Sequence, residues 1–177
     1  GMIDLFGGTK NFIQKLDENF TLTATSGERN GNASGFIGQY AHGNEPSHHT
    51  VYLYNFAGKP SRTQELVHQV RSSFYNATPC GYAGNDDCGQ MSAWYIFSAL
   101  GFYPFNAGSA EYVIGTPLYK KATLHLAGGK DFVINAPNKT DERIYVKKVK
   151  LNGKILTDLK ISHQQIMAGG TLDFQMK

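Results

Sequence analysis

Two short polar stretches of this sequence carry the residue types that could do chemistry. The first is GNEPSHH at residues 43–49, and the second is GNDDCGQ at residues 84–90. Each opens with Gly-Asn, is rich in side-chain oxygens, and directly precedes an aromatic-rich segment that we expect to be helical. Both stretches are therefore expected on loops at helix N-termini, and they would meet at one end of the molecule if those helices pack side by side.

The polar residues of these stretches exceed what helix capping requires. One side-chain oxygen is enough to cap a helix, and Asp87 could do so for a helix that begins near Gly89. Histidines that follow a proline turn are likewise often packed or surface residues. The surplus of oxygens nevertheless favours a polar site. Its candidate residues are Asn44, Glu45, His48, His49, Asn85, Asp86, Asp87 and Gln90.

The donor types narrow the chemistry of such a site. Carboxylate and amide oxygens without cysteine ligands suit a hard cation such as calcium. A carboxylate that faces a second acid across a sugar is the arrangement for glycoside hydrolysis. The sequence contains neither the G-x-S-x-G turn of a serine nucleophile nor a phosphate-binding loop. The residues alone therefore indicate a hydrolase or a binding site for a polyhydroxylated ligand, with calcium as a candidate ion.

Charge is distributed unevenly along the chain. Residues 76–118 contain Asp86, Asp87 and Glu111 but no Lys or Arg, so these carboxylates need solvent, distant partners, a metal or a substrate. Residues 119–177 carry eleven basic and five acidic side chains, a net charge of +6. A basic tail can bind nucleic acid. These lysines are dispersed through strand-like sequence, as solvent-facing residues are, and we expect no nucleic-acid partner.

Other classes of protein are disfavoured by the sequence. No apolar run approaches the roughly 20 residues of a membrane span, and no secretory signal peptide is found in the chain. Cys80 and Cys88 are the only cysteines, and they lack the further ligands that a zinc site requires. A disulfide remains open, and the sequence favours two buried or half-buried thiols.

Hydrophobic periodicity predicts helices in the first two-thirds of the chain. Phe12, Leu16 and Phe20 lie four apart within a helix predicted over residues 9–20. A loop dense in Gly, Ser, Thr and Asn follows at residues 23–36, and a second helix is expected across residues 48–58.

Two further helices are predicted before residue 101. Ser61 and Gln64 match a capping box at the start of one, which places Leu66, Val70 and Phe74 on a single stripe. The next is expected over residues 89–100. It is apolar nearly all round, so we expect it to be buried on most faces, with Gly101 as its C-cap.

After about residue 110 the pattern changes to short β-rich segments separated by Gly, Pro and Asn. Asn152-Gly153 predicts a type I′ hairpin turn. The order of elements indicates an α+β protein. We divide it into a helical segment at residues 1–115 and a small antiparallel β module at residues 116–177.

In one strand of that module, the hydrophobic residues do not all fall on the same side. Ile144 and Val146 share one side of the strand, whereas Val149 and Leu151 share the other. A single buried face can hold all four only if a β-bulge lies near residues 147–148.

Several long motifs resemble glycoside hydrolase family 92. They are GNEPSHH followed by YLYNFAGKP, then GYAGNDDCGQMSAWYIFSALGFYPF, then YVIGTPLYKKATLHL, and a tail of VKLNGKIL and GGTLDFQM. The resemblance extends from about residue 35 to the C-terminus. Members of this family are calcium-dependent exo-acting α-mannosidases, many of them α-1,2-specific and abundant in gut Bacteroidetes. Their longer chains contain a β-sandwich and an (α/α)6 barrel, so residues 1–115 resemble the last part of that barrel.

The resemblance implies an inverting mechanism on a mannose-containing glycan, with calcium as the cofactor. In many members the second loop reads Gly-Asp-Glu-Asp, and its two aspartates are tied to the general base. Asp87 matches the last aspartate and is the candidate base, Asp86 stands at the glutamate, and Asn85 replaces the first aspartate. Glu45 and Asn44 are implied in binding calcium and sugar. His48, His49 and Gln90 are implied in binding the substrate.

The family's general acid is a glutamate in a stretch resembling E-G-x-x-W-Q-Y, and this chain contains no such stretch. We therefore expect the chain to be inactive alone and to associate with the missing N-terminal part of the enzyme or with itself. The resemblance implies a periplasmic or extracellular location. A non-catalytic carbohydrate-binding module and a structural remnant of such an enzyme are the alternative functions.

Overall fold

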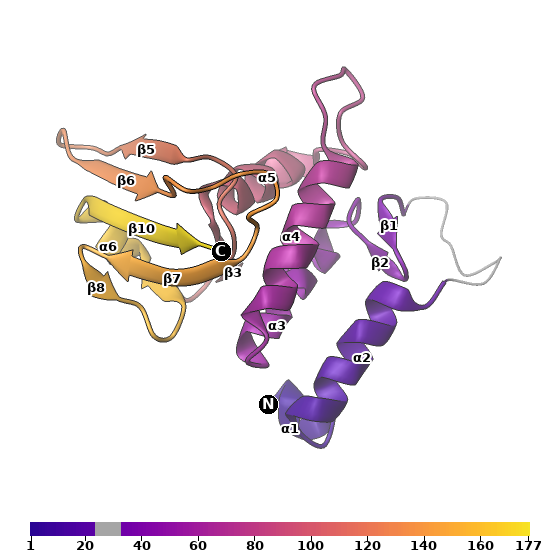
Figure 1. Ribbon diagram of the computed structural model, residues 1–177. Helices are drawn as coiled ribbons and strands as arrows, with labels where there is room; N and C mark the ends of the chain where they lie inside the picture. The colour runs from indigo at the N-terminus through magenta and orange to yellow at the C-terminus, as the bar shows by residue number, and fades with distance from the viewer. Residues whose placement is uncertain (24–32) are drawn as a thin grey trace.

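The computed structural model of the protein describes residues 1–23 and 33–177. The predicted loop at residues 23–36 falls largely outside this part. In the described residues, helices come first along the chain and a β module follows (Figure 1). The predicted α+β class is confirmed. No helix in the described ranges is long and apolar enough to cross a membrane.

The N-terminal helices follow the predicted periodicity. A short helix, α1 (Met2–Leu5), leads into α2 (Thr9–Thr21), whose buried residues are Phe12, Leu16 and Phe20. These three residues lie four apart and form one stripe, as the sequence predicted. After the strands β1 (Phe36–Ile37) and β2 (Tyr40–Ala41), the chain makes the 3-10 turns Glu45–Ser47 and Thr50–Tyr52. The helix predicted over residues 48–58 is thus shorter, and its α-helical part is α3 (Leu53–Phe56).

The long helix α4 (Pro60–Phe74) starts differently from the prediction. Pro60 occupies its first turn and Lys59 is its N-cap, so Ser61 lies inside the helix and the predicted capping box is wrong. Proline is well suited to this position because its missing N–H would have no helical partner there. Gln64 is buried instead, and its Oε1 accepts a hydrogen bond from the backbone N–H of Val146 at 3.0 Å. The glutamine thereby links α4 to the β module.

Helix α5 (Gln90–Leu100) confirms its predicted bounds. It ends at Gly101, whose φ of 94° gives the left-handed C-cap that glycine adopts without strain. Met91, Trp94, Ser98 and Ala99 are buried. Ile96 is 57% exposed, so one face of this apolar helix is open in the described chain.

The strands form two larger sheets besides the β1–β2 pair. A three-stranded sheet has the order β3-β4-β9 and contains β3 (Phe102–Asn106), β4 (Glu111–Ile114) and β9 (Lys160–Ser162). A five-stranded sheet has the order β5-β6-β10-β7-β8. Its strands are β5 (Lys121–His125), β6 (Asp131–Asn135), β7 (Val146–Leu151), β8 (Lys154–Ile155) and β10 (Gly170–Met176). A short helix, α6 (His163–Met167), precedes β10.

Two local predictions about β7 are confirmed. Asn152 and Gly153 have φ values of 48° and 79°, as a type I′ turn between β7 and β8 requires. Met176 pairs with Val146 while Gln175 pairs with Lys148, so Lys147 is the extra residue of a β-bulge. One ladder departs from the antiparallel expectation, because β10 pairs with β6 in parallel.

The β3–β4 hairpin lies between two hydrophobic cores. Tyr103 and Val113 belong to the core of the helical part, whereas Phe102 and Ile114 belong to the core of the sheets. Adjacent strand residues point to opposite faces, so one hairpin can serve both cores. The hairpin also pairs through β4 with β9, which lies beyond residue 115. The division at residues 115 and 116 stays a prediction, and hydrogen bonds cross it.

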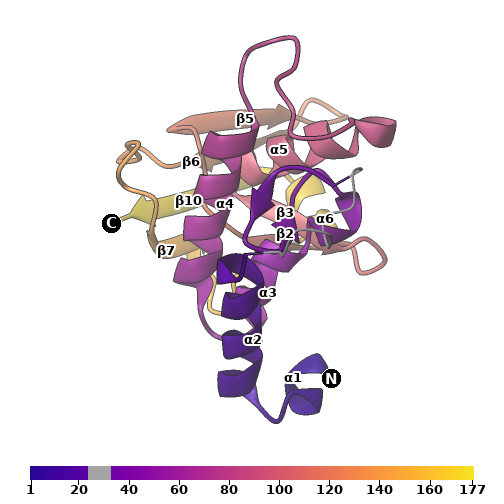
Figure 2. The ribbon, with the colours of Figure 1, turned by 90° about the vertical axis from the view of Figure 1, so that its right-hand side faces the viewer.

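A buried arginine joins the two parts at their junction. Arg71 of α4 is 4% exposed, and its Nη1 donates to the carbonyl oxygens of Ser98 at 2.7 Å and Thr116 at 2.8 Å. Burial lowers the pKa of Arg71 to about 10, which still leaves it charged at neutral pH. In Figure 2, α4 and α5 stand next to the five-stranded sheet, while α1 and α2 extend away from it.

Candidate functional site

The two polar loops meet through their glycines. A Cβ built on Gly84 would lie 2.7 Å from the Cα and 2.7 Å from the carbonyl oxygen of Gly43, so only glycine permits this approach of the two backbones. Ser34 Oγ donates a hydrogen bond to the carbonyl oxygen of Ala83, and the N–H of Gly43 donates to Ser34 O at 3.0 Å. The sequence-based expectation that the loops meet is therefore confirmed.

Residues of both polar loops line a pocket of about 310 Å³. The first loop contributes Glu45, His48 and His49 to its wall, and Gln90 enters from the start of α5. Tyr103 and Phe105 enter from β3, where they share one face of the strand. The remaining lining residues are Pro46, Ala93, Trp94, Phe97, Pro104 and Ala107. The pocket thus combines apolar walls with a few converging polar groups, as small-molecule sites do.

His48 is held in one tautomer at the base of the pocket. It is 1% exposed, and its Nε2 lies 2.9 Å from the carbonyl oxygen of His42, which can only accept. Nδ1 is therefore the unprotonated nitrogen, and it accepts from Nε2 of Gln90 at 3.1 Å. Burial lowers the pKa of His48. At neutral pH this histidine is uncharged and fixes the orientation of Gln90.

A second buried histidine lies behind the first. The ring of His42 stacks on that of His48 at 4.6 Å between centroids. Tyr75 OH donates to Met91 O at 3.1 Å, so the hydrogen bond of 2.7 Å between Tyr75 and His42 Nε2 takes its proton from the histidine. The hydroxyl of Tyr40 then donates to His42 Nδ1 at 2.8 Å. Burial, followed by the proximity of His48, lowers the pKa of His42 to about 3.

Trp94 connects this layer to α5. Its indole Nε1–H donates to His48 O at 3.1 Å, its ring meets His42 edge-on at 4.4 Å, and it is fully buried. The ring of Tyr75 also stacks on Trp94, with the ring planes 8° apart. A buried tryptophan that finds a partner for its N–H fixes both its own ring and that partner. The backbone of the first loop is therefore anchored on α5.

The two aspartates of the second loop have different environments. The Oδ1 of Asp86 accepts from the backbone N–H of Ser92 at 2.9 Å, and Oδ2 accepts from Ser92 Oγ at 2.7 Å. These hydrogen bonds cap the first turn of α5, so the capping role considered for Asp87 belongs to Asp86. They also lower the pKa of Asp86. Asp87 is exposed, and its carboxylate makes no hydrogen bond or ion pair with the residues that the structure describes.

The backbone after Asp87 is strained. Cys88 has φ 53° and is followed by Gly89 at φ 80°, so two successive residues are left-handed. This conformation is unfavourable for a residue that carries a Cβ, and it turns the chain sharply from Asp87 into α5. Both cysteines are free and exposed, so the favoured expectation of buried or half-buried thiols is wrong, and the two thiols form no disulfide.

Four of the eight predicted site residues line the pocket, namely Glu45, His48, His49 and Gln90. Asn44 lines a different pocket beside α1 and α2. Asn85, Asp86 and Asp87 are exposed and do not line the pocket within the described chain. Their predicted catalytic roles stay predictions.

Tyr103, Phe105 and the buried His42 behind the pocket were not among the residues predicted for this site. Tyr103 and Phe105 follow the predicted C-cap Gly101 and were assigned to no strand, although their spacing of two is the strand signal that places both on one face. His42 stands directly before GNEPSHH, and its buried position could not be read from one sequence.

The donors at this site do not suffice for calcium. The pocket offers one carboxylate, Glu45, and the amide oxygen of Gln90, whereas calcium takes six to eight oxygen ligands. No group of three or more His, Cys, Asp or Glu in the described ranges is placed to hold a metal ion. As a complete calcium site, these residues do not fit.

Comparisons with known proteins identify a family and several relatives of this chain. The family model described as "Glycosyl hydrolase family 92 catalytic domain" matches residues 1–177. An uncharacterized secreted glycosidase of Arthroderma benhamiae is 30% identical over 185 residues, which are 99% of this chain and 21% of that protein.

Solved structures show the same relationship. A family GH92 α-mannosidase from Bacteroides thetaiotaomicron, solved in complex with mannoimidazole, matches with a TM-score of 0.89 and 39% identity over 96% of this chain and 22% of its own. A family GH92 inverting mannosidase from the same organism matches with a TM-score of 0.83 and 41% identity, covering 98% of this chain and 25% of its own. The chain therefore spans between a fifth and about a quarter of the length of the relatives it matches.

Proposed function

Because the chain belongs to glycosyl hydrolase family 92, we propose that it supplies part of the mannose-binding site of an inverting exo-α-mannosidase. Its substrate would be a mannose-containing glycan, with α-1,2-linked mannosides as the first to test. The name of the Arthroderma benhamiae relative supports a secreted location, outside the cell or in the periplasm.

The observation that carries this proposal is the pocket where the two polar loops meet. At about 310 Å³ it lies at the lower end of the range for ligand pockets, which suits one terminal sugar ring better than a longer chain. Phe105, which is half-buried, offers apolar surface to the carbon face of a sugar. Glu45, His49 and Gln90 offer hydrogen bonds to its hydroxyl groups.

We assign the general base to Asp87 rather than to Asp86. A general base uses a lone pair to accept a proton from the attacking water molecule. Each oxygen of Asp86 accepts a hydrogen bond from Ser92, which holds this carboxylate at the first turn of α5 and lowers its pKa. The carboxylate of Asp87 is exposed and free of such contacts among the described residues. Asn85 carries no charge and is assigned no proton transfer.

The chain alone should bind mannose without cleaving glycosides. An inverting mechanism needs an acid and a base roughly 6.5–9.5 Å apart. The assigned base, Asp87, does not line the pocket, and the single carboxylate that does is Glu45. This observation also favours the second candidate function, a carbohydrate-binding module without hydrolytic activity. Calcium is given no role in this proposal, because the oxygen ligands in the pocket are too few to bind it.

A chimera tests the catalytic assignment. The matching quarter of the Bacteroides thetaiotaomicron inverting mannosidase is replaced by this chain, which is 41% identical to it, and mannose release from α-1,2-mannobiose is measured. Asp87→Asn should lower kcat by at least about 100-fold, because general base catalysis contributes on the order of 10²–10⁴-fold. Asparagine is nearly isosteric, so the melting temperature should change little.

Asp86→Asn is the matched control for that chimera. It should weaken the cap of α5 and lower stability by about 1 kcal/mol, while kcat falls less than tenfold. If Asp86→Asn abolishes turnover and Asp87→Asn does not, the two roles are reversed and the assignment is wrong. If the chimera folds but neither binds nor cleaves mannosides, the proposed function fails and the structural-remnant alternative gains support.

A further inference from the structure

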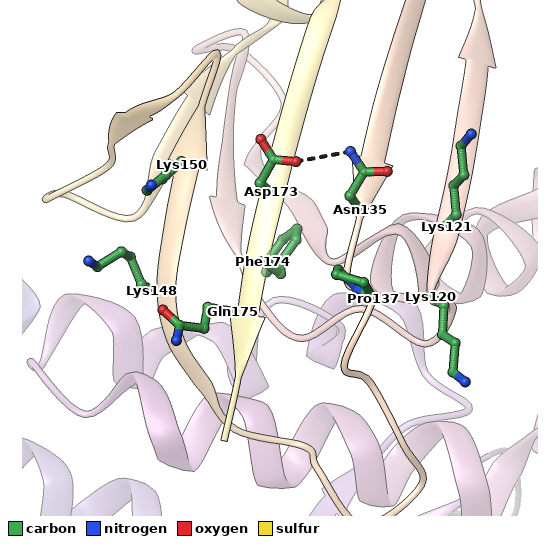
Figure 3. Close-up of a pocket in the computed structure, with 9 residues that line it drawn as sticks. All are labelled: Lys120, Lys121, Asn135, Pro137, Lys148, Lys150, Asp173, Phe174 and Gln175. Carbon is green, nitrogen blue, oxygen red and sulfur yellow. Dashed lines mark hydrogen bonds between the residues drawn. The ribbon is translucent and has the colours of Figure 1, made fainter.

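A second and larger concave surface lies on the five-stranded sheet, far along the chain from the polar loops. Its volume is about 630 Å³, and it shares no lining residue with the mannose pocket. Figure 3 shows four lysines around it, Lys120 and Lys121 at β5 and Lys148 and Lys150 on β7. Asn135, Pro137, Asp173, Phe174 and Gln175 complete the lining. We call this surface the lysine groove.

The alternation of β7 explains why its lysines gather there. Val149 and Leu151 are buried in the core of the sheets, so Lys148 and Lys150 face the opposite side. The pairing register continues the row across the sheet, from Lys150 to Asp173, from Asp173 to Asn135, and from Asn135 to Lys121. Lys121, Lys148 and Lys150, which are dispersed in the sequence, therefore lie on one face of the sheet.

The positive charge of the lysine groove is largely uncompensated. Within residues 1–23 and 33–177 the ammonium groups of its four lysines form no ion pair. Its one carboxylate, Asp173, accepts hydrogen bonds from Asn135 at 2.9 Å and from Thr171 at 3.0 Å, rather than pairing with a lysine. Four like charges around one concavity attract anionic groups.

The spacing of the lysines defines the kind of anion. Strands β5 and β7 are separated by β6 and β10, so they lie three strand spacings apart. At about 4.8 Å for each spacing, the two lysine pairs are about 14 Å apart. A single phosphate or sulfate ion cannot reach both pairs, whereas a chain with anionic groups at intervals of a few sugar rings can.

We propose that the lysine groove binds an anionic polysaccharide that crosses the strands of the sheet. The side chains between the lysine pairs suit hydroxyl groups, since Asn135 and Gln175 carry amides and each oxygen of Asp173 can accept a further hydrogen bond. Phe174 is the only aromatic residue of the lining and is 2% exposed, so the groove has no platform on which nucleic-acid bases would stack. The proposal concerns a surface separate from the mannose pocket and stands without the proposed catalytic roles.

Binding of dextran sulfate to the full 177-residue chain tests the proposal, with neutral dextran of the same length as the matched ligand. Titration at low salt should show saturable binding of dextran sulfate only, weakened by added salt because these charges are exposed. The triple variant Lys121→Gln, Lys148→Gln, Lys150→Gln should raise the Kd at least about tenfold, because one exposed ion pair contributes a factor of up to about five.

A control variant removes the same charge from the helical part, by Lys10→Gln, Lys15→Gln and Lys59→Gln. These lysines are exposed and do not line the groove, so the Kd should change less than twofold. If the two triple variants lose equal affinity for dextran sulfate, the binding depends only on net charge and the proposal is wrong.

Two further ligands complete the experiment. Inorganic sulfate should compete only at concentrations far above those of dextran sulfate, and equal potency per sulfate group would contradict a site that spans both lysine pairs. Single-stranded poly(dT) should bind more weakly than dextran sulfate of equal charge. If poly(dT) binds more tightly and the groove variant abolishes that binding, the surface recognises nucleic acid and the proposal is wrong.

Discussion

The two hydrophobic cores of this protein are built from different residues. The core of the helical part contains Tyr40, Tyr52, Tyr54 and Trp94, all of them buried aromatic residues with a polar atom. Each of these atoms is hydrogen-bonded, for example Tyr52 OH to Ser98 Oγ at 2.7 Å. The core of the sheets consists of Phe, Ile, Leu, Val, Met and Ala side chains, which pack without such bonds.

This difference indicates what each core does. Hydrocarbon side chains stabilise by burial, which is non-directional. Buried hydroxyl, indole and imidazole groups require partners in defined directions, because an unpaired buried polar group is costly. The helical core therefore fixes the loop backbones and the tautomers of His42 and His48 at the pocket. The sheet core supports a broad surface, on which the lysine groove lies.

The largest effect is expected where the two loops touch. Gly84→Ala would place a Cβ within 2.7 Å of the Gly43 backbone, which cannot move aside as a flexible side chain can. Separating the loops should lower the free energy of unfolding by about 3 kcal/mol and weaken mannose binding. Urea unfolding and calorimetric titration measure the two effects.

Gly108→Ala provides the control for that substitution. Gly108 lies in the β3–β4 turn, and a Cβ there meets only Asn106 Oδ1 at 3.5 Å. Neither glycine has a positive φ, so the comparison isolates the steric contact. A loss of stability as large for Gly108→Ala would show that glycine is needed for reasons other than the contact between the loops.

A pair of core substitutions gives the next largest effect. Trp94→Phe removes ring volume and the hydrogen bond to His48 O, and it should cost about 2 kcal/mol. Phe132→Leu in the sheet core should cost about 1 kcal/mol. Only Trp94→Phe should weaken mannose binding by more than about fivefold. Equal binding in both variants, measured where both are folded, would contradict a division of labour between the cores.

The pH dependence of stability gives the smallest of these effects. The folded pKa of His42 is about 3, below its usual value near 6.5, because burial disfavours the charged ring. Below pH 6.5 the unfolded chain binds the proton that the folded chain excludes, so stability is complete above pH 6.5 and falls as the pH decreases towards 3. The slope from this group is about 1 kcal/mol per pH unit, and burial of His48 acts in the same direction.

Urea midpoints at pH 6.5 and pH 5.5 measure this slope, in a range where carboxylates titrate little. His42→Gln removes the titrating ring while keeping polar atoms near Tyr40 and Tyr75. The variant should therefore lose the part of the pH dependence of stability that corresponds to about one proton. An unchanged slope in that variant would mean that His42 is charged or unburied in the folded protein.

Patterns within a single element were predictable from the sequence. The stripe of Phe12, Leu16 and Phe20, the C-cap at Gly101 and the turn at Asn152 and Gly153 each depend on local periodicity or backbone conformation. The bulge at Lys147 followed from the parity of its neighbours. The start of α4 was misassigned because Pro60 and the burial of Gln64 against Val146 outweighed a favourable capping pattern.

Only part of the candidate site was predictable from the sequence. The residue types of the two loops predicted a polar site, and the motifs that resemble family 92 predicted its chemistry. Which aspartate caps α5 was not predictable, because Asp86 and Asp87 are adjacent and identical in type, and the choice depends on the left-handed turn at Cys88.

The sequence by itself thus determined the buried stripe of α2, the end of α5, the turn after β7 and the residue types of the two polar loops, since these depend on neighbours within a few residues. The tertiary structure decided which side chains converge. The contact of Gly43 with Gly84, the entry of Tyr103 into the pocket, and the row from Lys121 to Lys150 each join residues distant in the chain. Such contacts form only when two buried faces pack or two strands pair in one register, and no local pattern specifies that partner.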